Sequence, residues 1–305
     1  MKEINRFIGK RNQYGRIWNK AVPYLLMAPV VIYMLAVLVV PIVYGIGLSF
    51  TNKMIGRDEQ FVGLKNYISL FHESEYLKSV KNTLKYTVVT VILKVVLGIG
   101  IALLMNSKIK FRSISRGLIL IPWAVPTVVS VTVWKWMYSD TGGVLNHILM
   151  SAGLTNQKIA WLSTPLLAFV SIVIINVWRG APFIGMSTLS GLQAVPPDIY
   201  ESAQIDGANI FQRFFYITLP SIKDVVMLAT LVTTIWTFND FELIWLVTKG
   251  GPISATQTIS IYTYKTGIQS MYTGKAMAAS ILFMPILVLL INMTTSRTLK
   301  QEDEL

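Results

Sequence analysis

Six long apolar stretches constrain this chain more than any other feature of its sequence. A helix needs about 20 mainly apolar residues to cross roughly 30 Å of hydrocarbon. Windows of that kind lie at about 22–50, 83–105, 117–138, 164–187, 223–247 and 275–296. They are continuously apolar rather than alternating, which excludes a membrane-spanning sheet. The sequence therefore predicts an all-α integral membrane protein, with a six-helix bundle forming one transmembrane domain at 22–296 between a basic N-terminal segment at 1–21 and a tail at 297–305.

Composition supports this class and argues against several others. The 305 residues are 53% hydrophobic and 14% charged, and the mean hydropathy is +0.55, which is too apolar for a soluble domain. The net charge of +12 comes from short basic runs beside the apolar windows, where such runs set topology, so we expect no nucleic-acid binding. Because cysteine is absent and His72 and His147 share no ligand spacing, we expect no disulfide, metal site or histidine-based catalysis.

Lysine and arginine gather between particular windows and predict the orientation. Lys2, Arg6, Lys10, Arg11, Arg16 and Lys20 precede the first window, and Lys108, Lys110, Arg112 and Arg116 follow the second. The positive-inside rule therefore places both termini and the segment between the fourth and fifth windows in the cytoplasm. The first window is too long for a signal-peptide core and no small-residue cleavage site follows it, which predicts an uncleaved anchor. In the first outer loop, FVGLKNYISLF has helical spacing and predicts either a short external helix or a covering loop.

The segment YESAQIDGANIFQRFFYITLP, at 200–220, is polar and rich in turn signals although apolar windows flank it. Pro197 suits the first turn of a short helix, and Gly207 suits a chain reversal in the left-handed region. A second short helix is expected from Asn209, as its cap, to Ile217, ending before Pro220. Exposed aromatic residues on such a cytoplasmic loop fit docking to a partner and folding back onto the bundle equally well, so the residues alone leave both open.

These residues also carry a family resemblance. Glu201, Ser202 and Ala203, then Asp206, Gly207 and Ala208, then Ile217, Leu219 and Pro220 resemble the E-A-A, D-G-A and I-x-L-P pattern of membrane subunits of ABC importers. Ser202 stands where alanine is usual, a small-for-small change. The family often has proline shortly after the L-P pair, whereas this chain has Ile222, Lys223 and Asp224.

The resemblance extends over nearly the whole chain. The blocks that carry it are PYLLMAPVVIYML, FVGLKNY, NTLKYTVV, IPWAVPTVVSVTVWKWMY, GGVLN, IAWL, WRGAPF, SGLQAVPPDIYESA and FNDFELIWLVTKGGP. They are similar to the carbohydrate-uptake branch, in particular its maltose-type and glycerol-phosphate-type first permease. The resemblance implies a bacterial cytoplasmic-membrane assembly of two homologous permeases, two cytoplasmic ATPase subunits and an extracytoplasmic solute-binding protein.

The resemblance also implies that a partner subunit hydrolyses the ATP and that this chain forms part of the transport pathway. No G-x-x-x-x-G-K-[ST] sequence occurs, so this chain is expected to be no enzyme and to bind no cofactor, with ATP and magnesium on the partner ATPase. Glu201 would pair with a basic residue of that ATPase, and Gly207 would form the turn between coupling helices. The predicted coupling residues are Glu201, Ser202, Ala203, Asp206, Gly207, Ala208, Phe211, Phe214, Phe215 and Pro220, within a loop at about 195–222.

A sugar site needs aromatic faces and short polar groups within the bundle. The best local concentration is Trp236, Asn239, Asp240, Phe241 and Glu242, with packed core and outer gate as the alternative reading. Lys94, Arg179 and Lys135 also fall inside predicted spans, where a charge at the bilayer centre costs at least about 2.5 kcal/mol. Lys94 is expected either to reach along its helix to an interface or partner subunit or to contact an anionic solute or a neighbouring helix. Arg179 is expected to have a structural or gating role, and Lys135 to extend its charge to the outer membrane surface.

Two alternatives to a sugar importer remain open. An importer of a glycerol-phosphate compound or an acidic oligosaccharide would give Lys94 more weight. A stand-alone secondary transporter or intramembrane enzyme belongs to a different class. The intramembrane enzyme would need paired carboxylates, histidines or a serine–lysine dyad inside the spans, and the sequence has only isolated charges there.

Overall fold

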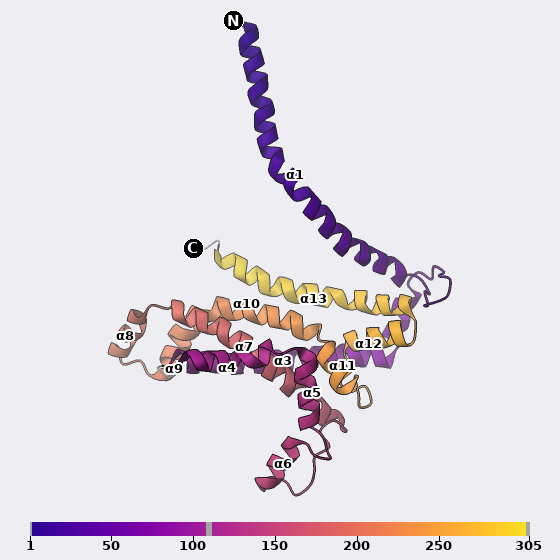
Figure 1. Ribbon diagram of the computed structural model, residues 1–305, viewed down its shortest axis with the longest axis vertical. Helices are drawn as coiled ribbons and strands as arrows, with labels where there is room; N and C mark the ends of the chain where they lie inside the picture. The colour runs from indigo at the N-terminus through magenta and orange to yellow at the C-terminus, as the bar shows by residue number, and fades with distance from the viewer. Residues whose placement is uncertain (1, 108–111, 303–305) are drawn as a thin grey trace.

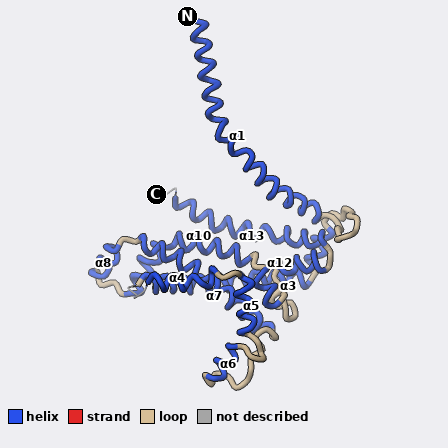
Figure 2. The backbone as a smooth tube through the Cα atoms, in the orientation of Figure 1, coloured by secondary structure: helices blue, strands red, loops and turns tan. Residues whose placement is uncertain are grey.

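The computed structural model describes residues 2–107 and 112–302, and these residues form helices joined by loops (Figures 1 and 2). The long helices are α1 (Lys2–Ser49), α3 (Ser74–Asn106), α7 (Pro165–Ala194), α10 (Leu219–Phe238) and α13 (Thr273–Glu302). The shorter ones are α2 (Lys65–Phe71), α4 (Arg112–Ala124), α5 (Thr127–Met137), α6 (Val144–Ser151), α8 (Pro197–Ile205), α9 (Ile210–Arg213), α11 (Glu242–Thr248) and α12 (Ile259–Tyr264), with π-helical turns η1 (Phe214–Thr218) and η2 (Lys265–Gln269). Lys108 and Lys110, used above for orientation, lie outside the described residues.

Helices α3, α7 and α10 form the centre of the bundle. Small residues bring α3 and α7 together, because a Cβ on Gly98 would lie 2.7 Å from Ile184 and one on Gly185 would lie 2.8 Å from Ile101. Close approach through small residues is how helices pack inside membranes, where lipid gives no hydrophobic drive for association. Helices α3 and α7 are therefore closely packed beside the site described below.

Four described helices are long and apolar enough to cross a membrane: Val22–Ser49, Ser74–Asn106, Pro165–Ala194 and the continuous Ile210–Phe238. A fifth span results if the bent pair Ser113–Ala124 and Thr127–Met137 counts as one. The sixth predicted window, 275–296, falls within α13, whose shorter apolar stretch is Thr273–Leu289.

Two predicted windows differ from the helices observed. The window at 117–138 is divided at Val125 and Pro126, where α4 and α5 meet with a bend of 91°. Proline disfavours the helical conformation of the residue before it, which explains the break. The window at 223–247 is divided after Phe238, because α10 ends there and α11 begins at Glu242. Both breaks lie beside the polar cavity described below.

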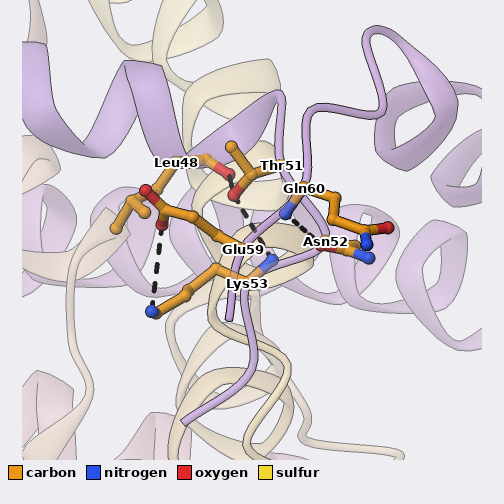
Figure 3. A network of polar contacts seen from close by, with 6 residues as sticks. All are labelled: Leu48, Thr51, Asn52, Lys53, Glu59 and Gln60. Atoms are coloured by element: carbon orange, nitrogen blue, oxygen red, sulfur yellow. Dashed lines mark hydrogen bonds and ion pairs between the residues drawn. The ribbon is translucent and has the colours of Figure 1, made fainter. Parts of the chain in front are cut away.

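Helix α1 leaves the other helices and extends away from them (Figure 1). None of the residues in its most apolar 18-residue stretch is buried, whereas Gly45, Leu48 and Ser49 near its C-terminal end are buried, where α1 contacts α13. The chain then turns through a hydrogen-bonded loop (Figure 3). Thr51 Oγ1 donates to the Leu48 carbonyl (2.9 Å), and the Gln60 amide donates to Asn52 Oδ1 (2.8 Å). This loop leads to α2, which is the short helix expected from FVGLKNYISLF.

Helices α8 and α9 lie at one end of the long helices, and α11 and α12 lie at the other (Figure 1). The C-terminal end of α13 lies at the α8 end, as the predicted topology requires. Helices α8 and α9 belong to the segment at 195–222 that the sequence analysis singled out. It therefore projects from the bundle on the side opposite the loop after α1.

The expected helix ending before Pro220 is wrong. Helix α9 continues through η1 into α10, and Pro220 lies in the first turn of α10. Proline normally clashes with the carbonyl four residues earlier and leaves it without a donor. The wider π-helical turn Phe214–Thr218 directly before α10 accommodates the ring. The segment is thus rigidly continuous with a spanning helix.

Candidate functional site

A cavity of about 390 Å³, lined mostly by apolar residues, lies between α1, α10, α12 and α13, and a smaller one in the centre of the bundle is lined by charged, polar and aromatic side chains. This second cavity, called the polar cavity below, has a volume of about 210 Å³. Its lining residues come from α3, α4, α7 and α10 and from the break after α10: Lys94, Trp123, Asn176, Arg179, Gly180, Trp236, Thr237 and Asp240. Four residues predicted from the sequence, namely Lys94, Arg179, Trp236 and Asp240, therefore line one space.

Hydrogen bonds hold the Asp240 carboxylate at the break between α10 and α11. Tyr86 Oη donates to Asp240 Oδ2 at 3.0 Å, and Asn176 Nδ2 donates to the same oxygen. Asn176 Nδ2 also donates to Tyr86 Oη at 2.7 Å, and the Leu243 amide donates to Asp240 Oδ1 at 3.4 Å. A half-buried carboxylate inside a bundle is tolerated when donors satisfy it in this way.

Lys94 reaches across from α3 to α10. Its Nζ donates to Thr237 Oγ1 at 2.9 Å and to Thr233 Oγ1 at 3.4 Å, and its side chain is only 4% exposed. Gly180 makes room for it, because a Cβ there would overlap the end of the lysine side chain. Among the expectations for Lys94, the structure shows the contact with a neighbouring helix, because the side chain bridges α3 and α10.

Aromatic side chains form one wall of the polar cavity. The Phe183 ring lies 6.2 Å from Trp123 and 5.0 Å from Trp236, measured between centroids. Both tryptophans are about half exposed in the isolated chain. Flat aromatic faces beside hydrogen-bonding groups match the apolar and polar sides of a sugar ring.

The structure places the other predicted solute residues elsewhere. Asn239 lines the separate 390 Å³ cavity and donates to the Ile235 carbonyl at 2.9 Å. Phe241 packs between Trp245 and Tyr264, and Glu242 is exposed at the start of α11. The sequence reasoning missed Tyr86, Trp123 and Asn176. An asparagine in the continuous apolar run of α7 was the available signal, since it must find partners there.

The 195–222 segment has the local structure that its sequence predicts. Helix α8 begins at Pro197, and Gly207 has φ +76°, in the left-handed region. Asn209 caps α9: its Oδ1 accepts from the Gln212 amide (2.9 Å), while Gln212 Oε1 accepts from the Asn209 amide (2.8 Å).

This segment presents apolar and acidic side chains outward. Ile205, Ile210, Phe211, Phe215 and Tyr216 are all strongly exposed, and so are Glu201, Ser202, Asp206, Gly207 and Pro220. Ala203 is buried, Ala208 is half-buried, and Phe214 is half-buried against Phe215 at 5.0 Å between ring centroids. A rigid projection with exposed aromatic groups is suited to a protein partner.

Another cavity, of about 540 Å³ and lined mainly by polar residues, lies at the end of the bundle opposite α8 and α9, between the start of α3 and the α12 region. Glu73 accepts from Tyr262 Oη at 2.9 Å and pairs with Lys275. Burial and the Glu73 carboxylate raise the pKa of the Tyr262 phenol. Burial lowers the pKa of Lys265, and the Glu75 carboxylate partly offsets this effect. These groups tie the loops of that end together.

The fold is that of a multi-pass membrane transport subunit, in which apolar helices enclose a polar cavity and a projection with exposed aromatic side chains extends from one end. The sequence matches the model of a family described as binding-protein-dependent transport system inner membrane component over residues 94–297, and the chain belongs to this family.

Relatives and solved structures agree with this assignment. The trehalose/maltose transport system permease protein MalF of Thermococcus litoralis is 38% identical over 79% of this chain and 81% of its own. The sulfoquinovosyl glycerol transport system permease protein SmoG of Agrobacterium fabrum is 30% identical over 86% and 85%. A chain of a bacterial ABC transporter that imports the acidic polysaccharide alginate shares the fold, with a TM-score of 0.80 at 23% identity over 93% of this chain and 99% of that one.

Proposed function

We propose that this chain is the permease subunit of a bacterial ABC importer for a sugar or oligosaccharide, with the solute passing by the polar cavity. The observation that carries the proposal is the cavity itself, where Trp123 and Trp236 stand beside Asn176, Arg179 and Asp240. Aromatic faces and convergent hydrogen-bonding groups are what a sugar requires. The similarity to a trehalose/maltose permease supports the same solute class.

The 195–222 segment is the proposed docking element for the ATPase. Glu201, on exposed α8, is placed to meet a basic side chain, and Phe211 and Phe215 supply apolar contact area. Because η1 joins this projection to α10, a movement of the partner is passed as a rigid body to the helix that carries Trp236 and Thr237. The partner ATPase binds the ATP and magnesium.

The complete assembly is proposed to hold a second homologous permease, two ATPase subunits and an extracytoplasmic solute-binding protein. The solved complex of an alginate ABC transporter with its periplasmic protein supports the last of these partners. Both termini and the 195–222 segment are proposed to be cytoplasmic, since α8, α9 and the end of α13 lie at one end of the long helices. The polar cavity would then lie within the membrane.

An acidic solute is the second candidate. Lys94 and Arg179 outnumber Asp240 in the polar cavity, so its formal charge is positive. The similarity to a sulfoquinovosyl glycerol permease and to a transporter of the acidic polysaccharide alginate supports this candidate.

Purification of the tagged subunit from its native membrane tests the assembly. We expect a second permease and an ATPase to accompany it in stoichiometric amounts, identified by mass spectrometry. A subunit that purifies alone and transports solute under an ion gradient would support the stand-alone transporter instead.

A further inference from the structure

Three charged side chains line the polar cavity, and the bundle itself satisfies two of them. Lys94 donates to Thr237 and Thr233, close to the C-terminal end of α10, where the helix dipole favours a cation. Asp240 accepts hydrogen bonds from Tyr86, Asn176 and the Leu243 amide. Neither charge needs a ligand to be stable.

Arg179 differs from both. It forms no hydrogen bond or ion pair with any other residue that the structure describes, and its Nε is buried without a partner. Asn176 Oδ1, in the same cavity, also lacks a donor, although the Asn176 side chain is only 6% exposed. A buried polar group left unpaired costs about 1–3 kcal/mol, and a charged group costs more. The polar cavity therefore holds one unused cationic donor and one unused acceptor.

We propose that Arg179 recognises the solute. Its planar guanidinium donates hydrogen bonds to two neighbouring oxygen atoms of the sugar, while Asn176 Oδ1 accepts a hydrogen bond from a sugar hydroxyl. This inference rests on the proposed function of the polar cavity. Two neighbouring oxygens are present in the vicinal hydroxyls of a neutral sugar and in the carboxylate of a sugar acid, and both fit the arginine fork. Lys94 and Asp240 are then positioning residues that fix the shape of the cavity.

The experiment measures equilibrium binding of radiolabelled maltose, trehalose and digalacturonate to the complete purified assembly in nanodiscs. The sugar that the wild type binds best is then titrated against Arg179→Gln, Arg179→Lys and Arg116→Gln. Arg116 is the matched control, because it is another half-buried arginine whose Nε has no partner, but it lies on α4 outside the cavity. Size-exclusion chromatography checks that each variant remains assembled.

Arg179→Gln is expected to weaken binding at least about tenfold, and Arg116→Gln to leave it within about twofold, as loss of a charged hydrogen bond predicts. If the best sugar is neutral, Arg179→Lys should lose as much as Arg179→Gln, because the fork geometry is gone. If it is digalacturonate, Arg179→Lys should recover part of the loss as a point charge.

Two results would overturn the inference: wild-type affinity in Arg179→Gln, or loss of the second permease from that variant, which would assign Arg179 to the subunit interface. If the wild-type assembly binds none of the three sugars, the proposed function fails and this inference fails with it.

Discussion

Gly180 shows how a single residue sets the geometry of the polar cavity. The Lys94 side chain passes over it to reach Thr237, and any side chain at that position would occupy the same space. The sequence predicted Lys94 and Arg179 as charges inside apolar runs, and Asp240 as part of a cluster of aromatic and short polar residues. It did not separate Asp240 from Asn239, since the break after α10 decides which of two adjacent side chains turns toward α3 and α7.

Gly180→Ala is expected to displace Lys94 and to destabilise the purified subunit by about 1–3 kcal/mol, the usual cost of overpacking. Thermal unfolding in detergent measures this. Gly100→Ala on α3 is the control, because nothing lies within 4 Å of a Cβ there. Equal transition temperatures for the two variants would show that the Lys94 bridge does not depend on Gly180.

At the scale of elements, the local structure of the 195–222 segment was the most predictable. The breaks in the predicted spans, between α4 and α5 and after α10, were the least predictable. Pro197, Gly207 and Asn209 act locally, through fixed φ, left-handed φ and capping, so their roles follow from sequence. The effect of Pro220 depends on the wider turn η1 before it, which no local rule signals. The 91° bend between α4 and α5 likewise needs tertiary packing to stabilise it.

Asn209→Ala removes the capping box of α9 and should cost about 1 kcal/mol locally. Amide exchange at residues 210–213 is then expected to accelerate about fivefold, because local opening becomes easier. Hydrogen–deuterium exchange with mass spectrometry measures this exchange rate. Asn156→Ala, at an exposed loop position, should change nothing. Unaltered exchange in Asn209→Ala would mean that partner contacts, not the cap, order this helix.

Glu201→Lys reverses a charge on exposed α8 without disturbing a buried contact. We expect normal membrane insertion, weaker retention of the ATPase during purification and loss of uptake, since the variant would repel a basic partner residue. Glu59→Lys, on the loop at the other end of the molecule, serves as the control. Unchanged uptake in Glu201→Lys would remove Glu201 from the coupling mechanism.

At the scale of the whole molecule, the apolar windows predicted the fold class, while the arrangement of α1 was not predictable. Its apolar side chains are exposed in this chain, as lipid contact requires, and only packing could show that α1 leaves the bundle. The orientation can be tested directly because the chain has no cysteine. Asp58→Cys should react with a membrane-impermeant maleimide in intact cells, and Asp206→Cys only after permeabilisation; the reverse pattern would invert the topology.

The central claim is that this subunit moves a sugar using ATP hydrolysed by a partner docked at the 195–222 segment. Uptake of radiolabelled sugar by proteoliposomes containing the full assembly and its binding protein tests it most directly. We predict uptake with ATP on the ATPase side, abolished by Glu201→Lys and indifferent to proton or sodium gradients. Uptake that needs an ion gradient and proceeds without ATP would contradict the account.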